Sequence, residues 1–174
     1  LYTPSLYIPF TLNRALMMAA QTQLGGIDFL VNNAGISQSG MFEEYDNLEA
    51  YRRLMEVNYF GVLECIRRAL PALKARRGVL CVISSVAGLI GAPQRTGYGA
   101  TKAAINSFCE SLRMEVEEVE VVVVCPGPVS TSINDTRLTQ DGSKSKVGLH
   151  TGGAMSSLTA AQLILAGLKN TTPL

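Results

Sequence analysis

Short apolar runs alternate along the chain with longer segments in which apolar residues recur every three to five positions. The runs at 27–31, 79–83 and 119–125 have the length of strands, and each is followed by polar residues, glycine or proline. Continuous apolar runs of this kind are typical of strands buried on both faces of a parallel sheet. The periodic segments at 48–74 and 98–118 predict two long helices.

Two further helices are predicted toward the ends of the chain. One covers 12–24 and is closed by two glycines, and the other begins at Ser156 or Ser157 and runs to about Lys169. Strands that alternate with helices form right-handed crossovers and hence parallel sheets. The predicted fold class is therefore α/β, a doubly wound Rossmann-like parallel sheet with helices on both faces.

Residues 1–174 are assigned to a single domain, and we expect this domain to be incomplete. The three predicted strands are about two or three fewer than the roughly five or six strands of an average sheet. No glycine-rich phosphate loop of the form Gly-x-x-x-Gly-x-Gly follows a strand, and the chain begins at Leu1 without a methionine. A long segment poor in apolar residues, 134–153, predicts a mobile loop over the substrate site.

Composition narrows the function. The chain is 47% hydrophobic and 17% charged, which favours a folded domain with a real core. A net charge of +1 gives no reason to expect nucleic acid as a partner. No apolar run approaches the ~18–20 residues of a membrane span, so none is expected within this chain.

The cysteine and histidine content argues against metal and triad chemistry. The four cysteines are 16, 28 and 16 residues apart within apolar runs, which predicts buried, reduced thiols rather than a zinc site or a disulfide framework. The single histidine, His150, cannot form a histidine cluster. We therefore predict no metal site and no Ser-His-Asp triad.

Polar residues follow all three predicted strands. They are Asn32-Asn33-Ala34-Gly35, then Ser84-Ser85, then Pro126 to Thr131. Because ligands bind beyond the carboxyl ends of parallel strands, we expect these three segments to border one crevice.

Two residues on the helix over 98–118 could carry proton chemistry. Tyr98 and Lys102 are four positions apart and therefore share a helix face, and a nearby ammonium lowers the pKa of a phenol. Ser85 precedes Tyr98 by 13 residues and can bind a substrate oxygen beside the phenol. Asn58 precedes Tyr98 by 40 residues and lies inside a predicted helix. Asparagine is disfavoured in a helix interior, so a specific role for its side chain is expected.

These residues resemble the Asn, Ser, Tyr, Lys tetrad of the short-chain dehydrogenases/reductases. The similarity lies in Val57-Asn58-Tyr59-Phe60-Gly61, Ile83-Ser84-Ser85 and Tyr98-Gly99-Ala100-Thr101-Lys102, together with the segments that follow the first and third strands. It covers about 12–169, the second half of the family's fold. The segment after Ser132 is most similar to the branch of dehydrogenase/reductase members 7 and 7B.

The resemblance implies hydride transfer between a nicotinamide cofactor, NADP or NAD with NADP favoured, and a small-molecule alcohol or carbonyl substrate. A lipid-like substrate such as a steroid or retinoid is implied by the branch. Tyr98 would donate or accept the proton and Lys102 would lower the pKa of Tyr98 and hold the ribose. Ser85 would polarise the carbonyl, with Ser84 the lesser choice by spacing, and Asn58 would hold a relay water or be a satisfied helix-kink residue.

The family pattern also implies cofactor contacts. Asn32, Ala34 and Gly35 would lie near the adenosine half, although the two asparagines could equally tie neighbouring strands together. Pro126, Gly127, Val129 and Thr131 would surround the nicotinamide, with Tyr98 and Lys102. Without the family's glycine-rich loop, the pyrophosphate has no evident binding site in this sequence.

The resemblance further implies a homodimer or homotetramer built through the helices at 48–74 and 98–118. The localisation stays unknown at this point: the protein could be cytoplasmic, or associated with the endoplasmic reticulum if an upstream anchor exists. Two other functions stay open. One is a non-catalytic remnant acting through an exposed sheet edge or an oligomer interface. The other is a Ser-Lys hydrolase, for which the chain has no Gly-x-Ser-x-Gly motif.

Overall fold

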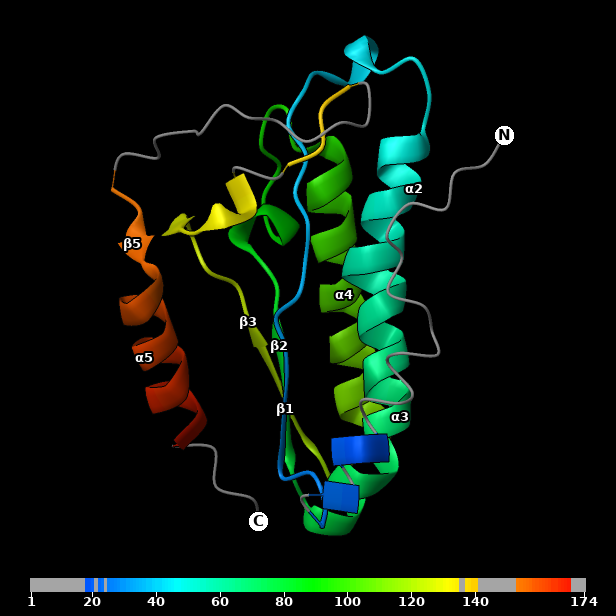
Figure 1. Cartoon of the computed structure of the whole chain (residues 1–174), viewed down its shortest axis with the longest axis vertical. Helices are drawn as coiled ribbons and strands as arrows, with labels where there is room; N and C mark the ends of the chain where they lie inside the picture. Colours follow the sequence, from blue (N-terminus) through cyan, green and yellow to red (C-terminus); the bar gives the residue numbers. More distant parts are fainter. Residues whose placement is uncertain (1–17, 21, 24, 135–136, 141–152, 170–174) are drawn as a thin grey trace.

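The computed structural model describes residues 18–20, 22–23, 25–134, 137–140 and 153–169. Its centre is a parallel sheet of three strands in the order β1-β2-β3 (Figure 1). The strands are β1 (Phe29–Asn32), β2 (Val79–Ile83) and β3 (Glu120–Val124). In the register of the sheet, Leu80 lies beside Leu30 on one side and Val121 on the other.

Helices cover both faces of the sheet and make a three-layer molecule (Figure 1). One face carries α3 and α4, and the main hydrophobic core lies between these helices and the sheet. The other face carries α5, whose Leu168 packs on Val79 and Cys81. The helices are α2 (Glu49–Met55), α3 (Gly61–Arg76), α4 (Thr96–Glu115) and α5 (Ser157–Lys169).

Short elements gather beyond the carboxyl ends of the strands (Figure 1). A two-residue parallel pair joins the segment after β3 to the start of α5. The sequence did not predict this pair, because two-residue strands have no recognisable period. These elements are η1 (Phe42–Glu44), η3 (Val86–Gly88), β4 (Val129–Ser130), η4 (Ser132–Asn134) and β5 (Met155–Ser156).

The predicted α/β fold class is confirmed, and most element boundaries lie close to the prediction. The strand at 79–83 is found as predicted, and α5 begins at Ser157. The helix expected at 98–118 begins earlier, at Thr96, and ends at Glu115, because β3 already begins at Glu120 and the chain must turn before it. Of the helix expected over 12–24, the described residues 18–20 and 22–23 are helical, and the rest lies outside the described residues.

The first strand was wrongly predicted to be fully buried. Alternate residues of β1 differ in exposure, and Phe29 and Val31 are 56% and 49% exposed. Leu30, between them, packs against the main core. Among the described residues β1 has a strand neighbour on one side and a helix layer on one face, so its other face stays open to solvent.

The helix predicted over 48–74 is continuous but changes character in its middle. Between α2 and α3 lies one π-helical turn, η2 (Glu56–Phe60), which is closed by a hydrogen bond from the Gly61 N–H to the Glu56 carbonyl. Single π-turns inside α-helices occur frequently at functional sites. This π-turn contains Asn58, the residue for which a specific role was expected because asparagine is disfavoured in a helix interior.

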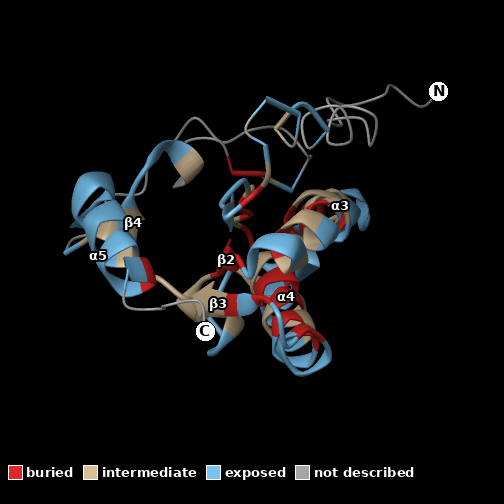
Figure 2. Ribbon diagram, turned by 90° about the horizontal axis from the view of Figure 1, so that it is seen from below, coloured by how far each residue is buried: buried red, intermediate tan, exposed pale blue. Residues whose placement is uncertain are grey.

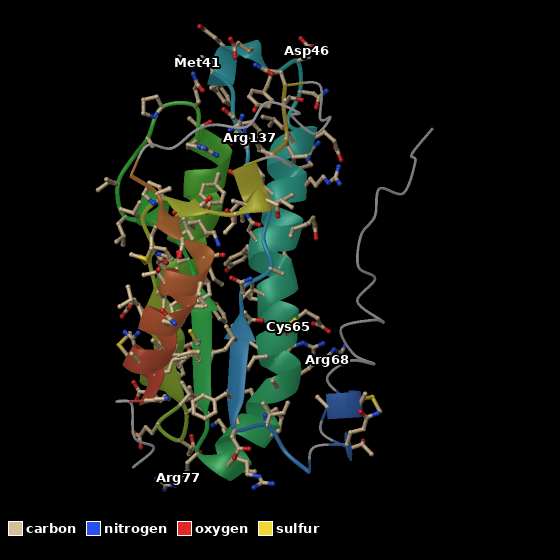
Figure 3. The ribbon with its side chains drawn as sticks, turned by 60° about the vertical axis from the view of Figure 1, so that its left-hand side comes forward. Met41, Asp46, Cys65, Arg68, Arg77 and Arg137 are labelled. Atoms are coloured by element: carbon tan, nitrogen blue, oxygen red, sulfur yellow. The ribbon has the colours of Figure 1, made fainter. Side chains whose placement is uncertain are left out.

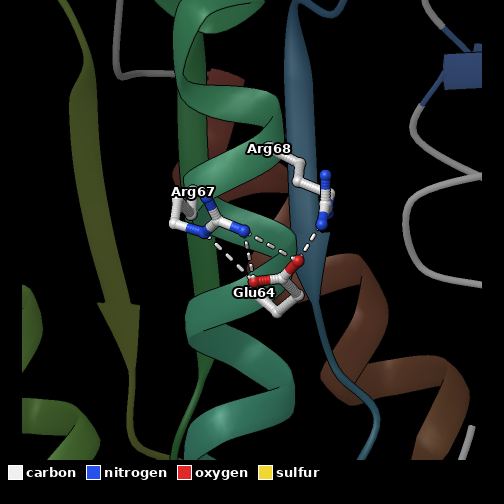
Figure 4. A network of polar contacts seen from close by, with 3 residues as sticks. All are labelled: Glu64, Arg67 and Arg68. Atoms are coloured by element: carbon white, nitrogen blue, oxygen red, sulfur yellow. Dashed lines mark hydrogen bonds and ion pairs between the residues drawn. The ribbon is translucent and has the colours of Figure 1, made fainter. Parts of the chain in front are cut away.

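One charged side chain on α3 is buried. The Glu64 carboxylate, 8% exposed, accepts hydrogen bonds from Arg67 at 3.1 Å and Arg68 at 2.5 Å (Figure 4). Burial raises the pKa of this carboxyl, but the hydrogen bonds and charges of the two arginines outweigh it and leave the pKa below its usual value. Glu64 is thus held ionised within its own helix.

Part of the predicted mobile loop is packed into the molecule. Arg137 and Leu138 are buried, and Leu138 forms an isolated parallel bridge with Gln38. Tertiary pairing therefore packs these two residues although the segment has few apolar residues of its own, while the mobility of the loop stays a prediction. Residues 141–152 of that loop, with His150, lie outside the described residues.

Buried residues concentrate on β2 and on the sides of α3 and α4 that face the sheet, whereas α5 is largely exposed (Figure 2). All four cysteines are free; the predicted burial is found for Cys81 and Cys109, whereas Cys65 and Cys125 are only half-buried. None of the helices in the described ranges has the length and hydropathy needed to cross a membrane.

Candidate active site

A cavity of about 540 Å³ lies where the strands end. The three polar segments predicted to border one crevice all contribute to its lining, through residues such as Asn33, Ser85 and Pro126. The prediction that the strand ends converge is therefore confirmed. Tyr98 and Lys102 reach the same cavity from the first two turns of α4.

Burial dominates the ionisation of Tyr98. It raises the pKa of the phenol, while a hydrogen bond with Ser85 and the charge of Arg95 act in the opposite direction. The sequence predicted that Lys102 would lower this pKa. In the structure the net effect is a raised pKa, because desolvation exceeds the favourable contacts, and the Lys102 Nζ lies 5.8 Å from the centre of the Tyr98 ring, over its face.

The Lys102 ammonium is anchored at the end of β2. Its Nζ donates a 2.9 Å hydrogen bond to the Ile83 carbonyl oxygen, and the residue is only 6% exposed. Desolvation lowers the pKa of Lys102 to about 8, with Cys125 acting in the opposite direction. An ammonium has three donors, so one bond to a carbonyl leaves it capacity for a bound hydroxyl.

The two serines after β2 have different surroundings. The Ser84 hydroxyl is buried and donates to the Lys102 backbone carbonyl at 3.4 Å, which ties it to α4. Ser85 caps η3, where its Oγ accepts a hydrogen bond from the Ala87 N–H at 3.2 Å. Both serines border the cavity, but Ser85 is the one that interacts with the Tyr98 phenol.

Asn58 does not line the cavity but joins the elements around it. The Asn58 side-chain oxygen accepts a hydrogen bond from the Ile36 N–H, and the side-chain nitrogen donates one to the Ile36 carbonyl; each is 2.9 Å long. It also donates to the Thr101 hydroxyl at 3.1 Å, and Thr101 in turn donates to the Tyr98 carbonyl at 2.8 Å. Both amide hydrogens are thereby used, whereas Oδ1 keeps one lone pair.

Two glycines let η3 lie directly against α4. A Cβ on Gly88 would be 2.7 Å from the Lys102 carbonyl carbon, and one on Gly99 would be 2.9 Å from the Ala87 oxygen. Real Cβ atoms essentially never come this close. The absence of side chains at these positions allows Ser85 to approach Tyr98.

Most of the predicted cofactor residues border the cavity. Seven of the nine do so, and Asn32 and Ala34 are the two that do not. Successive residues of a strand face opposite sides, so Asn32 points away from the cavity while Val31 and Asn33 face it. The Asn32 Nδ2 is buried and has no hydrogen-bond partner in the described part of the chain.

The sequence reasoning missed the contribution of α5. This helix supplies much of the apolar wall of the cavity with residues spaced at three and four positions, as one face of a helix requires. That spacing can be seen in the sequence and could have identified the apolar face of α5. It could not have shown that this face lies opposite the strand ends. The residues are Ser157, Ala160, Ala161, Ile164, Leu165 and Leu168.

The described residues contain no group of three or more His, Cys, Asp or Glu side chains suited to a metal ion. The side chains that face the cavity include a phenol, an ammonium and hydroxyls at the carboxyl end of a parallel sheet. Fold and site together define a Rossmann-type α/β protein with a ligand cavity at its strand ends.

Comparison with known proteins agrees with this class. The sequence model of the short chain dehydrogenase family matches residues 11–142. Dehydrogenase/reductase SDR family member 7B of Bos taurus is 40% identical over 148 residues, which are 83% of this chain and 45% of that protein. 11-beta-hydroxysteroid dehydrogenase A of Sesamum indicum is 33% identical over 132 residues, 75% of this chain and 38% of that protein.

A short chain dehydrogenase from Burkholderia cenocepacia J2315, solved in complex with NADP, superposes with a TM-score of 0.79. It is 26% identical, and the match covers 97% of this chain and 65% of the solved one. The chain belongs to the short-chain dehydrogenase/reductase family, in the branch related to member 7B. It spans less than half the length of these two curated relatives.

Proposed function

We propose that this chain carries the proton-transfer site of an NADP- or NAD-dependent oxidoreductase that interconverts an alcohol and a carbonyl compound. The observation that supports this most is the meeting of Tyr98, Lys102 and Ser85 on the wall of one cavity at the strand ends. The three residues come from two separate segments of the chain. Packing of the hydrophobic core does not require that they all face the same cavity.

In this proposal Tyr98 is the proton donor in reduction and the acceptor in oxidation. Its raised pKa keeps the phenol protonated at neutral pH, which suits donation to a developing alkoxide. Ser85, hydrogen-bonded to the phenol, orients the carbonyl oxygen of the substrate. Lys102, whose Nζ lies 5.8 Å from the centre of the Tyr98 ring, would stabilise negative charge on the phenol and bind the ribose hydroxyls, and Asn58 would hold the water that returns the proton.

The residues at the cavity fit the nicotinamide end of such a cofactor. Gly35 and Gly127 both border the cavity, and nothing lies within 4 Å of a Cβ built on Gly127, so a flat ring could approach the backbone there. At Gly35 the Cβ position lies 3.2 Å from Asn58 Oδ1, so a side chain there would press on Asn58. The cofactor would supply or accept the hydride; NADP is favoured because solved relatives, including the Burkholderia cenocepacia protein, contain it.

We propose a substrate with an apolar body. Opposite the polar side chains, α5 contributes alanine, isoleucine and leucine to the wall, and such a surface suits a steroid-like or retinoid-like molecule. The similarity to a hydroxysteroid dehydrogenase supports this class. A homodimer or homotetramer formed through α3 and α4 remains a prediction.

Tyr98→Phe tests the proposal. It removes one oxygen and keeps the ring, so we expect turnover of a carbonyl probe with NADPH to fall by at least about 10³-fold, in the range attributed to a general acid. Binding of NADPH, followed by nicotinamide fluorescence, should stay within twofold of the wild-type value. Substantial residual turnover would contradict the role of Tyr98, and Lys102→Ala should instead weaken both binding and turnover.

The Ser-Lys hydrolase alternative has little geometric support. Within the described part of the chain, Lys102 Nζ donates its hydrogen bond to the Ile83 carbonyl and not to either serine. Labelling of Ser85 by a serine-reactive probe would nevertheless revive it. The non-catalytic alternative is separated by cofactor binding, which it does not require.

A further inference from the structure

The start of α4 is capped by a side chain that comes from the segment after β1. Gln38 is fully buried, at 0% exposure. Its Oε1 accepts hydrogen bonds from the backbone N–H groups of Gly97 at 2.9 Å and Tyr98 at 3.1 Å. The N–H groups of a first helical turn have no partner within the helix, and Arg95, which directly precedes α4, makes no side-chain cap. Gln38 performs that task from 60 residues away.

The other end of the Gln38 amide is fixed as well. Its Nε2 donates to Tyr51 Oη on α2 at 3.2 Å, and Tyr51 Oη lies 2.7 Å from the Thr96 hydroxyl. Gly97 leaves the space that this arrangement needs, because a Cβ there would lie 2.7 Å from Gln38 Oε1. The amide is thus held in one orientation, with its carbonyl toward α4.

The backbone around Gln38 is held by a segment distant in the sequence. Leu138 donates to the Ser37 carbonyl at 2.8 Å and accepts from the Ser39 N–H at 3.1 Å. Arg95 donates to the Ser37 hydroxyl at 2.5 Å and to the Gln38 carbonyl at 2.8 Å. Figure 3 shows neighbouring Arg137 at the end of the molecule where the strands end. Gln38 therefore has little freedom to move.

We propose that Gln38 is a positioning residue, whose side-chain carbonyl holds the first turn of α4 so that the Tyr98 phenol meets Ser85 and Lys102. The inference rests on the proposed role of Tyr98. One of the two N–H groups that Gln38 binds belongs to Tyr98 itself, so a shift of the cap moves the phenol directly. Displacement by about 1 Å from a productive geometry can cost on the order of 10²-fold in rate.

Three variants of the full chain test the proposal. Gln38→Leu keeps the size of the side chain and removes the acceptor, whereas Gln38→Glu keeps two acceptor oxygens, to which Tyr51 can donate. Gln140→Leu is the matched control, because Gln140 is exposed and bonds only Glu44 among the described contacts. If Gln38→Leu does not fold, Gln38→Asn replaces it, since the shorter amide cannot reach α4.

Two of the measurements test the role of Gln38 without requiring enzymatic turnover. Hydrogen exchange at the Gly97 and Tyr98 amides should accelerate about tenfold in Gln38→Leu and stay unchanged in the other two variants. The Tyr98 phenol, followed by NMR of ¹³C-tyrosine and assigned with Tyr98→Phe, should titrate closer to the ordinary tyrosine value in Gln38→Leu. The charged groups that face it, Arg95 and Lys102, remain in all variants.

The third measurement is turnover of 9,10-phenanthrenequinone with NADPH. We expect kcat to fall at least tenfold in Gln38→Leu with the KM for NADPH within twofold, and to recover in Gln38→Glu. Faster exchange with unchanged titration and kcat would make Gln38 a helix cap only and overturn the proposal, as would wild-type exchange in Gln38→Leu. If the wild-type chain shows no turnover, the proposed function fails, while exchange and titration still decide the role of Gln38.

Discussion

Lys102 is an ammonium group that folding has largely removed from water. Its Nζ donates to a backbone carbonyl, and within the described residues it forms no ion pair with a carboxylate. The charged form is therefore disfavoured in the folded state, and the pKa falls from 10.5 to about 8. A buried cation without a carboxylate partner reduces stability, which suggests that its position serves the site rather than the core.

This burial predicts a pH dependence of stability. Between pH 8 and 10.5 the unfolded chain keeps a proton on Lys102 that the folded chain has lost, so the free energy of unfolding should rise with pH through this window, by up to about 3 kcal/mol. Urea unfolding of the wild type and of Lys102→Met, compared from pH 7.5 to 10.5, measures the difference. Parallel curves for the two proteins would contradict the assigned burial of the charge.

At the scale of elements, the site depends on how closely η3 approaches α4. Gly88→Ala would place a methyl group 2.7 Å from the Lys102 backbone, so η3 must move away and take Ser85 with it. We expect kcat to fall at least about tenfold and stability to fall by about 1–3 kcal/mol. Steady-state turnover and urea unfolding of the purified variant give the two values.

Gly91→Ala is the control for that experiment, because nothing lies within 4 Å of a Cβ at Gly91. Its stability should stay within about 0.5 kcal/mol of the wild type. Equal losses of turnover in the two variants would show that the contact between η3 and α4 has no special role in the site.

At the scale of the whole molecule, the question is whether this chain binds the complete cofactor. It spans less than half the length of the two curated relatives, and its cavity at the strand ends is the place that we propose for the nicotinamide end. If the chain binds NADPH, a concentration of 100 Kd should stabilise the folded state by about 2.7 kcal/mol and raise the melting temperature. Differential scanning fluorimetry with NADPH and then NADH makes the measurement.

We expect saturable stabilisation by NADPH that exceeds the effect of NADH. In Lys102→Ala the shift should be smaller at every cofactor concentration, because the ribose contact is lost. No shift with either cofactor would favour the non-catalytic alternative, in which the exposed Phe29 and Val31 of β1 meet another chain.

The amino-acid sequence by itself determined the alternation of helices and strands, the α/β class and the residues that meet at the strand ends. Periodicity is a local property, and carboxyl ends of parallel strands share one edge whatever the details of packing. The strand at 79–83, the helix that carries Tyr98 and Lys102, and the polar segments bordering the cavity all follow from these two facts.

Only the tertiary structure decided the details that depend on contacts between distant residues. Burial, which raises the pKa of Tyr98, requires knowing what covers the phenol. Asn33 rather than Asn32 faces the cavity because α5 encloses the cavity on that face of the sheet, which strand alternation alone does not tell. The cap that Gln38 places on α4 joins residues 60 positions apart. Desolvation and long-range hydrogen bonds arise from packing in three dimensions, so no local pattern in the chain could reveal them.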